Sequence, residues 1–329
     1  METISSRRIL ARTLALVLAA AVSSLPNGAR AETPAVTMQI GTAGNDSSAQ
    51  AFFATDLGYF KDAGIDAHTL IVARGTGPAI ISAVVGGSLD VGQSDMIALA
   101  QAHDHGIPIV IVAPSVAYDS KASTTSLVVP KESAIRSARD LNGKTIGILS
   151  LSGPTNAATM AWIEQNGGDL SSVKFVELAN AQMGSALKSG VIAAGAIAEP
   201  ALSATLQLGD TRILANPYDS VSKSFLLSAW FMSKAWADAH PETVKKFAEV
   251  MHQTAVWANN PANHGRSADI LASYIKLPAA TIDRSVRAKF GLTFSAAEAQ
   301  PIIETAAKYK FVQNTLPIAS MLSPLALKP

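Results

Sequence analysis

Apolar positions recur at two different spacings along most of the chain. Residues 36–42 alternate apolar and polar side chains, which is typical of a half-buried strand, whereas the apolar residues of 51–57 have helical spacing. The segment 107–113 is apolar on both faces, which predicts a central parallel strand covered by helices on both sides. The same patterns predict strands at 65–73 and 89–92 and helices at 75–85 and 95–102.

A second cycle of strands and helices follows Tyr118. Strands are predicted at 126–129, 144–149, 173–178 and 194–198, with helices at 154–165 and 182–188. From Pro241 the pattern is mostly helical, and Pro241 and Glu242 suit the first turn of a helix. The alternation indicates an α/β fold with doubly wound sheets, in which ligands bind beyond the carboxyl ends of the strands.

One pattern occurs twice. Residues 83–92 and 186–195 each predict the end of a helix, a glycine in the left-handed cap, a short apolar strand and a second glycine. A candidate binding segment follows each copy, at 93–95 and at 197–200. Two equivalent halves predict two lobes that face one another across a cleft.

The first 31 residues have the features of a cleavable signal peptide. Arginines precede the apolar run 14–22, and Ala29-Arg30-Ala31 supplies small residues at the cleavage site. The run is shorter than the roughly 20 residues that a permanent anchor needs. The chain has no cysteine to carry a lipid, so we expect a periplasmic protein that is not lipid-anchored.

Composition narrows the classes of function. Apolar residues make up 48% of the 329 positions and charged residues 16%, which excludes a disordered chain. The 26 basic and 25 acidic residues nearly balance and form no basic run, which argues against a nucleic-acid partner. With no cysteine there is no disulfide, thiolate metal site or cysteine nucleophile. The length suggests about two domains.

Several short motifs are spread along the chain. They are Asp56 to Ile65 (DLGYFKDAGI), Gly75-Thr76-Gly77, Gly87 to Gly92 (GSLDVG), Leu141 to Gly147 (LNGKTIG), Glu199-Pro200, His240-Pro241-Glu242 and Trp257 to Pro261 (WANNP). In order and spacing the chain resembles the type II periplasmic solute-binding proteins of ABC importers, in the group that binds nitrate, sulfonates, taurine and thiamine precursors. One departure is Ala193, where the family has an Asp that matches Asp90.

The resemblance implies a two-lobed architecture. Residues 32–118 and 219–329 would form lobe 1, residues 119–218 would form lobe 2, and two crossings near Tyr118 and Tyr218 would form a two-stranded hinge that closes on a ligand in the cleft. It also implies a monomer that is not an enzyme, needs no cofactor or metal, and delivers a small solute to a permease and ATPase in the inner membrane.

Candidate ligand residues follow from strand and helix ends. Residues 150–156 follow a strand and start a helix, so free amides there attract an anion, and helix capping is the alternative role for their hydroxyls. The candidates from this turn are Ser152, Gly153, Thr155 and Asn156. The others are Asn45, Asp46, Gly75, Thr76, Ser94, Asp95, Tyr118 and Glu199.

Three of these candidates conflict with an anionic ligand. Asp46, Asp95 and Glu199 would repel a sulfonate or nitrate unless protein donors engage them. Asp95 suits the cap of the following helix, and Glu199 suits a role at the hinge. If two of them face the ligand, they favour an amine, an aminopyrimidine or a zwitterion such as taurine. Tyr118 suits either stacking on a planar ligand or packing in the hinge.

The leading hypothesis is therefore an importer component that captures a small organic anion or zwitterion, most simply a sulfonate. A binder of a pyrimidine or other planar heterocycle is the alternative within the class. A periplasmic enzyme using Asp46, Asp95 or Glu199 as acid or base is another, and a sensor that signals to a membrane receptor is a third. His103 and His105 are expected to be solvated rather than to bind metal.

Overall fold

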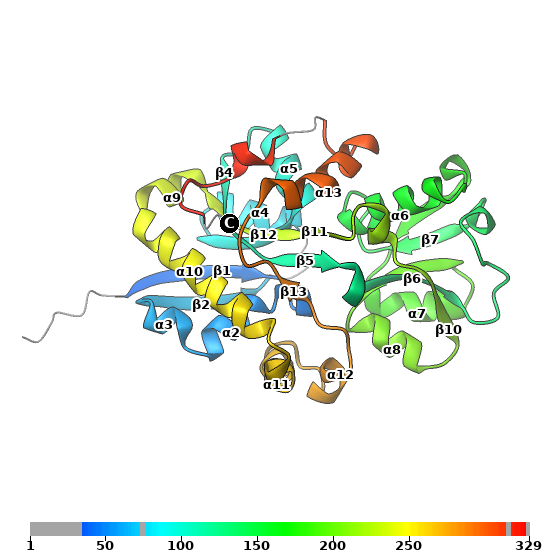
Figure 1. Ribbon diagram of the computed structural model, residues 1–329, viewed down its shortest axis with the longest axis horizontal. Helices are drawn as coiled ribbons and strands as arrows, with labels where there is room; N and C mark the ends of the chain where they lie inside the picture. The colour runs from blue at the N-terminus through cyan, green and yellow to red at the C-terminus, as the bar shows by residue number, and fades with distance from the viewer. Residues whose placement is uncertain (1–34, 73–76, 314–316, 327–329) are drawn as a thin grey trace, which may run out of the picture. The chain divides into compact units, whose positions relative to one another are not determined.

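Two five-stranded sheets, each with helices on both faces, form the framework of the chain (Figure 1). The computed structural model describes residues 35–72, 77–313 and 317–326. The predicted signal peptide and the candidates Gly75 and Thr76 lie outside these ranges. The α/β class predicted from the sequence is confirmed.

The first sheet has the strand order β2-β1-β3-β12-β4. Its strands are β1 (Val36–Thr42), β2 (Ile65–Ile71), β3 (Val91–Asp95), β4 (Ile109–Pro114) and β12 (Ser228–Ser233). One face packs on α4 (Gly77–Val85), α5 (Met96–Asp104) and α13 (Ala296–Lys308). The other packs on α2 (Gln50–Asp56), α3 (Tyr59–Asp62), α9 (Lys234–Ala239) and α10 (Pro241–Ala258). Helices α11 (His264–Ile275) and α12 (Ala279–Asp283) pack against α2 and the end of α10.

The second sheet has the order β10-β6-β9-β7-β8. Its strands are β6 (Thr125–Pro130), β7 (Thr145–Ile148), β8 (Lys174–Glu177), β9 (Ala194–Ala198) and β10 (Thr211–Ala215). Helix α6 (Pro154–Gln165) covers one face, and α7 (Asn180–Lys188) and α8 (Ala201–Gln207) cover the other. Alternate residues of β6 enter the two cores, because successive strand side chains point to opposite faces.

The chain crosses between the sheets through a third, smaller sheet. Strand β5 (Val116–Asp119) leads towards the second sheet and pairs antiparallel with the returning β11 (Ser224–Leu226). Strand β13 (Lys289–Phe290) adds to the other edge of β5. Tyr118 lies on β5, whereas Tyr218 lies in the 3-10 helix Pro217–Ser220 that precedes β11.

The repeated sequence pattern forms the same turn twice. After α4 the amides of residues 88 and 89 both donate to the carbonyl of Ala83, and after α7 those of residues 191 and 192 both donate to Ala186. Gly87 and Gly190 take the left-handed conformation at φ 75° and 74°. Because this conformation strains other residues, glycine is the residue type that both turns require.

The repeat continues into the packing of the strands. A Cβ on Gly41 of β1 would lie 2.2 Å from Leu89 Cδ1, and one on Gly147 of β7 would lie 2.7 Å from Ile192 Cδ1. The two copies differ at the residue that precedes β3 and β9, which is Asp90 in the first copy and Ala193 in the second. The backbone amide of Gln39 donates to Asp90 Oδ2 at 2.7 Å. Ala193 has no side-chain oxygen and cannot accept the equivalent hydrogen bond. The departure at Ala193 thus removes a structural bond.

One prediction for the first sheet is wrong. The segment expected as a central parallel strand forms β4, which lies at the edge and runs antiparallel to β12. Both faces are apolar because Ile111 enters one core and Val112 the other. The edge itself is covered, since the Ser323 amide donates to the Ile111 carbonyl at 2.9 Å. Full coverage of an antiparallel edge strand gives the same sequence pattern as a buried parallel strand.

Close packing at Gly92 gives a test of the first core. A Cβ there would lie 2.4 Å from Ile80 Cγ2 and 3.0 Å from both Phe231 Cε1 and Val84 Cγ2. We expect Gly92→Ala to lower the free energy of unfolding by about 1–3 kcal/mol through overpacking. Urea denaturation measures the change.

Gly265→Ala is the matched control. The nearest atom to a Cβ at this helical position is 4.0 Å away, so the substitution should leave stability unchanged or raise it by up to about 1 kcal/mol. Equal effects at the two glycines would contradict the packing described for β3.

Candidate functional site

Apart from Tyr118 on β5, the candidate residues in the described ranges lie at or after the carboxyl ends of two parallel strands in each five-stranded sheet. Asn45 and Asp46 follow β1, Ser94 and Asp95 end β3, residues 152–156 follow β7, and Glu199 follows β9. Each sheet thus presents polar groups at the edge where doubly wound folds bind ligands.

Asp46 is engaged by the protein. It is 3% exposed, and its carboxylate accepts hydrogen bonds from Arg287 Nε at 2.7 Å and from the Ala288 amide. Arg287 also donates from Nη1 to Ser267 Oγ at 2.9 Å. The sequence reasoning missed this cation, since it lies far along the chain and no motif marks it. Asn45 accepts a bond within its own loop, from Ser48 Oγ at 2.9 Å.

Asp95 and Ser94 lie against the start of α4. Asp95 Oδ1 accepts from the Ala98 amide at 2.9 Å, which confirms its predicted role as the cap of α5. A Cβ on Gly77 would lie 2.5 Å from Ser94 Oγ and 2.9 Å from Asp95 Oδ2, so both oxygens lie directly against that backbone. Burial raises the pKa of Asp95, and the Ala98 amide opposes the rise.

Ser94 has a second notable property. The side chain is 2% exposed, yet its hydroxyl has no hydrogen-bond partner within the described ranges. A buried hydroxyl without a partner is uncommon, because it costs the free energy of desolvation without recovering it. Its position at the end of β3 points to a role in binding.

The turn that starts α6 follows a strand and opens a helix, as the sequence predicts, but most of the amides expected to be free are engaged. The Gly153 amide donates to the Ser150 carbonyl, and the amides of Asn156 and Ala157 donate to the Gly153 carbonyl. The helix begins at Pro154 with Gly153 as its cap residue, and no side chain caps its first turn. The capping alternative for this turn is therefore wrong. Ser152 is exposed, and Thr155 Oγ1 lies 2.9 Å from the Tyr218 hydroxyl.

Asn156 occupies the first turn of the same helix. It is 3% exposed and donates from Nδ2 to the Leu151 carbonyl at 2.7 Å. Its Oδ1 atom is buried and has no partner in the part of the chain that the structure describes. The second sheet thus contributes an unpaired buried polar atom, as the first sheet does at Ser94.

Glu199 is also held by protein donors. It accepts from the Ser203 amide at 3.0 Å and from Ser203 Oγ at 2.9 Å. Burial raises the pKa of Glu199, the amides of Ser203 and Val286 lower it, and the charge of Asp46 raises it further. Glu199 from the second sheet therefore lies within electrostatic reach of Asp46 from the first.

Tyr118 is packed in the crossing. It is 2% exposed, its hydroxyl donates to Asp219 Oδ1 at 2.9 Å, and its ring lies 5.2 Å from that of Tyr218 and 5.3 Å from that of Phe225. This arrangement agrees with a hinge aromatic and leaves no face for stacking on a ligand. Burial raises the pKa of Tyr218, and the charge of Asp95 adds to the rise, so Tyr218 connects Asp95 with the start of α6.

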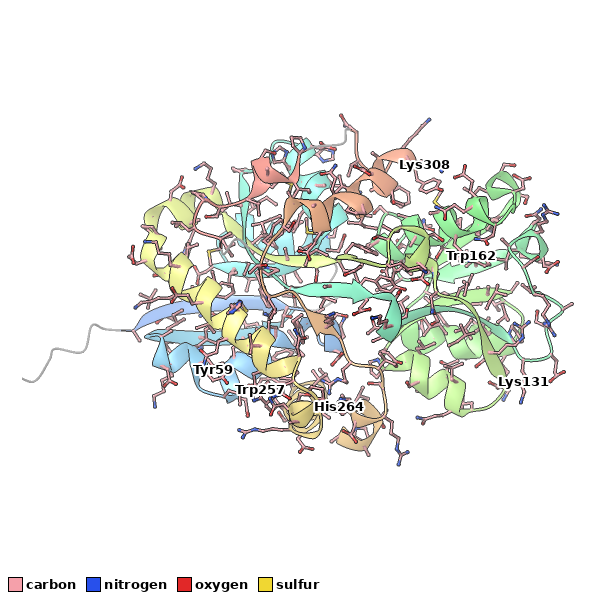
Figure 2. All side chains as sticks on the ribbon, in the orientation of Figure 1. Tyr59, Lys131, Trp162, Trp257, His264 and Lys308 are labelled. Carbon is pink, nitrogen blue, oxygen red and sulfur yellow. The ribbon has the colours of Figure 1, made fainter. Side chains whose placement is uncertain are left out.

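The far end of α6 is also attached to the first half of the molecule. Lys308 Nζ at the end of α13 donates to Glu164 Oε2, and the Tyr309 hydroxyl donates to the same oxygen at 2.8 Å. Figure 2 labels Lys308 on α13 and Trp162 on α6. These groups are about half exposed, so the ion pair itself adds little stability and chiefly orients the helix.

Two cavities lie elsewhere in the structure. One of about 500 Å³ is lined by residues that include Pro130, Ile135 and Lys144, and one of about 610 Å³ by residues that include His103, Lys234 and Leu325. Neither is lined by a candidate ligand residue. Within the described residues, no three His, Cys, Asp or Glu side chains are grouped to hold a metal ion. No helix in these ranges is long and apolar enough to cross a bilayer.

Comparison with known proteins identifies one family and several solved structures of similar fold. The profile of the family described as NMT1/THI5 like matches residues 45–263. The periplasmic aliphatic sulphonate-binding protein SsuA from Escherichia coli is 20% identical, with a TM-score of 0.72 over 87% of this chain and 97% of that one. The alkanesulfonate-binding protein SsuA from Xanthomonas axonopodis pv. citri, bound to MOPS, is 21% identical, with a TM-score of 0.71 over 88% and 98%.

A third solved structure has a similar backbone. The periplasmic nitrate-binding protein NrtA from Synechocystis PCC 6803 is 14% identical, with a TM-score of 0.74 over 88% of this chain and 86% of that one. No curated protein sequence matches the chain. These likenesses confirm the periplasmic binding protein fold that the sequence motifs predicted.

The buried pair of Asp46 and Arg287 gives a test of the site's framework. Arg287→Leu would leave the Asp46 carboxylate buried without its cation, so we expect a loss of about 3 kcal/mol in the free energy of unfolding. Lys289→Ala breaks the neighbouring, more exposed pair with Asp119 and should cost at most about 1 kcal/mol. Similar losses in urea denaturation of the two variants would contradict the arrangement.

Asp95 gives a test by pH. Its pKa is raised from 3.8 on folding, so its contribution to stability is full below that value and is lost as pH rises through the folded pKa. Asp95→Asn keeps an acceptor for the Ala98 amide but does not titrate. We therefore expect the variant to gain stability relative to the wild type as pH rises above the ordinary pKa of 3.8, as measured by urea denaturation.

Asp140→Asn is the control with the opposite sign. Amides of Arg136 and Ser137 lower the pKa of Asp140, so its contribution is present above its ordinary pKa and lost as pH falls. The Asp140 variant should lose stability relative to the wild type as pH rises towards the ordinary pKa of 3.8, and change little relative to it above about pH 5. Parallel pH profiles for the two variants would contradict the burial assigned to Asp95.

Proposed function

Because the chain belongs to the NMT1/THI5-like family, we propose that it is the solute-binding component of an ABC import system. It captures a small organic anion or zwitterion, of the sulfonate or taurine kind, and delivers it to a permease and ATPase in the inner membrane. The single observation that carries the proposal is the pair of buried, unpartnered polar atoms, Ser94 Oγ and Asn156 Oδ1. Ser94 lies at the carboxyl end of β3 in the first sheet and Asn156 in the turn after β7 in the second, where a solute bound by both halves would contact them.

The proposal assigns the anionic group to the start of α6. The helix has 12 residues, and no side chain caps its first turn. Pro154 has no N–H and the amides of Asn156 and Ala157 donate to the Gly153 carbonyl, so the helix offers an oxyanion the Thr155 amide and the positive end of its dipole. Ser152 adds a hydroxyl donor, and Thr155 adds a second when the Tyr218 hydroxyl is the donor in their shared hydrogen bond. The three carboxylates that conflicted with an anion each accept hydrogen bonds from protein donors, which supports an anionic or zwitterionic solute.

Binding is proposed to close two lobes around the solute. Residues 32–118 and 219–329 form one lobe and residues 119–218 the other, with β5 and β11 as the hinge strands. The paired strands and the buried tyrosines of the crossing support a hinge that bends without coming apart. Solved structures of similar fold carry sulfonate-binding and nitrate-binding names, which supports the ligand class.

Location and partners follow from the same proposal. Residues 1–31 are proposed to be removed as a signal peptide, so that the mature chain acts in the periplasm as a monomer without a lipid anchor. No catalytic role is assigned to Asp46, Asp95 or Glu199, because a general acid or base needs a carboxylate that is free to meet the substrate. Tyr118 gives no support to a planar ligand, since its ring is enclosed.

Calorimetry and thermal melting against a panel of sulfonates, nitrate and amino acids test the proposal. At about 100 times the Kd, a bound solute should add ~2.7 kcal/mol to the free energy of unfolding and be recovered unchanged by mass spectrometry. Ser152→Ala combined with Thr155→Ala should weaken an anionic solute about tenfold or more, by removing two hydroxyl donors.

Two results would contradict the proposal. Chemical conversion of a solute by the purified protein would indicate an enzyme instead. Unchanged affinity in the double variant would remove the anion from the start of α6.

A further inference from the structure

Tyr218 is buried beside the start of α6. It lies in the 3-10 helix Pro217–Ser220 of the returning crossing and is 4% exposed. Its hydroxyl oxygen lies 2.9 Å from Thr155 Oγ1 and has no other hydrogen-bond partner among the described residues. The same 3-10 helix is also bonded to the far end of α6, because Gln165 Nε2 donates to the Ser220 carbonyl at 2.9 Å. The returning crossing is therefore attached to α6 at both ends of that helix.

The hydrogen bond between Tyr218 and Thr155 has a preferred direction. Each hydroxyl has one hydrogen to donate. Burial raises the pKa of Tyr218, and the charge of Asp95 adds to the rise, so the phenol keeps its hydrogen. If Thr155 were the donor, the phenol hydrogen would be buried with no acceptor in the described ranges, which costs free energy. With Tyr218 as the donor, no buried hydrogen is left unpaired.

Thr155 then keeps its own hydrogen for another partner. The residue lies on the first turn of α6 and is only partly buried, and its hydroxyl has no second partner within the part of the chain that the structure describes. Because its oxygen accepts from Tyr218, its hydrogen points away from Tyr218. The accepted bond also polarises the Thr155 hydroxyl, which makes it a stronger donor.

We infer that Tyr218 is a positioning residue of the solute site: by donating to Thr155 Oγ1, it directs the Thr155 hydroxyl hydrogen towards an oxyanion bound at the start of α6. This inference rests on the proposed function and adds a residue of the returning crossing to it. Tyr218 itself does not contact the solute, because its hydroxyl is buried and engaged. It acts on the solute only through Thr155.

Urea denaturation without any solute tests the direction of the hydrogen bond. Thr155→Val removes the acceptor and leaves the buried Tyr218 hydroxyl unpaired, whereas Tyr218→Phe leaves only a partly exposed hydroxyl that water can reach. We expect Thr155→Val to lower the denaturation midpoint more than Tyr218→Phe does. Adding Tyr218→Phe to Thr155→Val should lower it no further. A larger loss in Tyr218→Phe, or losses that add in the double variant, would overturn the inference.

Isothermal titration calorimetry with ethanesulfonate tests the effect on a bound anion. We expect Thr155→Val to weaken binding about fivefold by removing a hydroxyl donor, and Tyr218→Phe to weaken it about threefold because the donor is no longer held in one orientation. In the Thr155→Val background, Tyr218→Phe should have no further effect on affinity. A purely structural role of Tyr218 would weaken binding equally in both backgrounds.

Tyr309→Phe is the matched control. The Tyr309 hydroxyl donates to Glu164 Oε2 near the other end of α6, so this variant also removes a tyrosine hydroxyl that is bonded to the helix. It should leave the affinity for ethanesulfonate unchanged. Circular dichroism checks that every variant folds.

The outcomes separate the inference from the proposed function. Equal affinity of the wild type and folded Tyr218→Phe for ethanesulfonate would overturn the inference and leave the solute-binding function standing. An effect of Tyr218→Phe that persists in the Thr155→Val background would do the same. Failure of ethanesulfonate to bind the wild type would count against both the anion assigned to the start of α6 and the inference.

Discussion

Buried polar groups need hydrogen-bond partners, and this constraint governs the arrangement of the candidate site. Asp46, Asp95 and Glu199 each obey it with donors from the protein, so three acidic residues near the proposed site need not repel an anionic group. Ser94 Oγ and Asn156 Oδ1 do not obey it within the described residues. His103 Nδ1 and Ser115 Oγ are also buried without a partner there, so within the candidate residues the rule distinguishes the engaged carboxylates from Ser94 and Asn156.

The internal repeat explains why the site draws on both halves. In each half the same pair of backbone hydrogen bonds closes a helix, and a large apolar side chain packs on a strand glycine. A candidate binding segment then begins at the end of β3 in the first half and of β9 in the second. Because β1 and β3 correspond to β7 and β9, the loops that follow these strands lie at the same edge of each sheet. A ligand that bridges them gains contacts from both halves, which is the physical basis for closure about a hinge.

Short-range sequence patterns predicted much of this structure. Features that depend on contacts between distant parts of the chain were not predicted. Helix α6 and strand β9 have the predicted bounds, because Pro154 and the flanking glycines mark them within a few residues. The antiparallel strand β12 was not predicted, and β4 was therefore assigned to the wrong place in its sheet. Arg287 was missed for the same reason, since its pairing with Asp46 depends on the tertiary fold. The unpaired state of Asn156 Oδ1 is likewise invisible without coordinates.

Hydrogen–deuterium exchange with and without the tightest-binding solute tests most directly whether the two halves share one ligand. The account predicts that the amides of residues 94–98 and of residues 153–157 become slower to exchange together, over the same range of solute concentration. Slowing in only one of these segments, or in neither while the solute is bound, would contradict it.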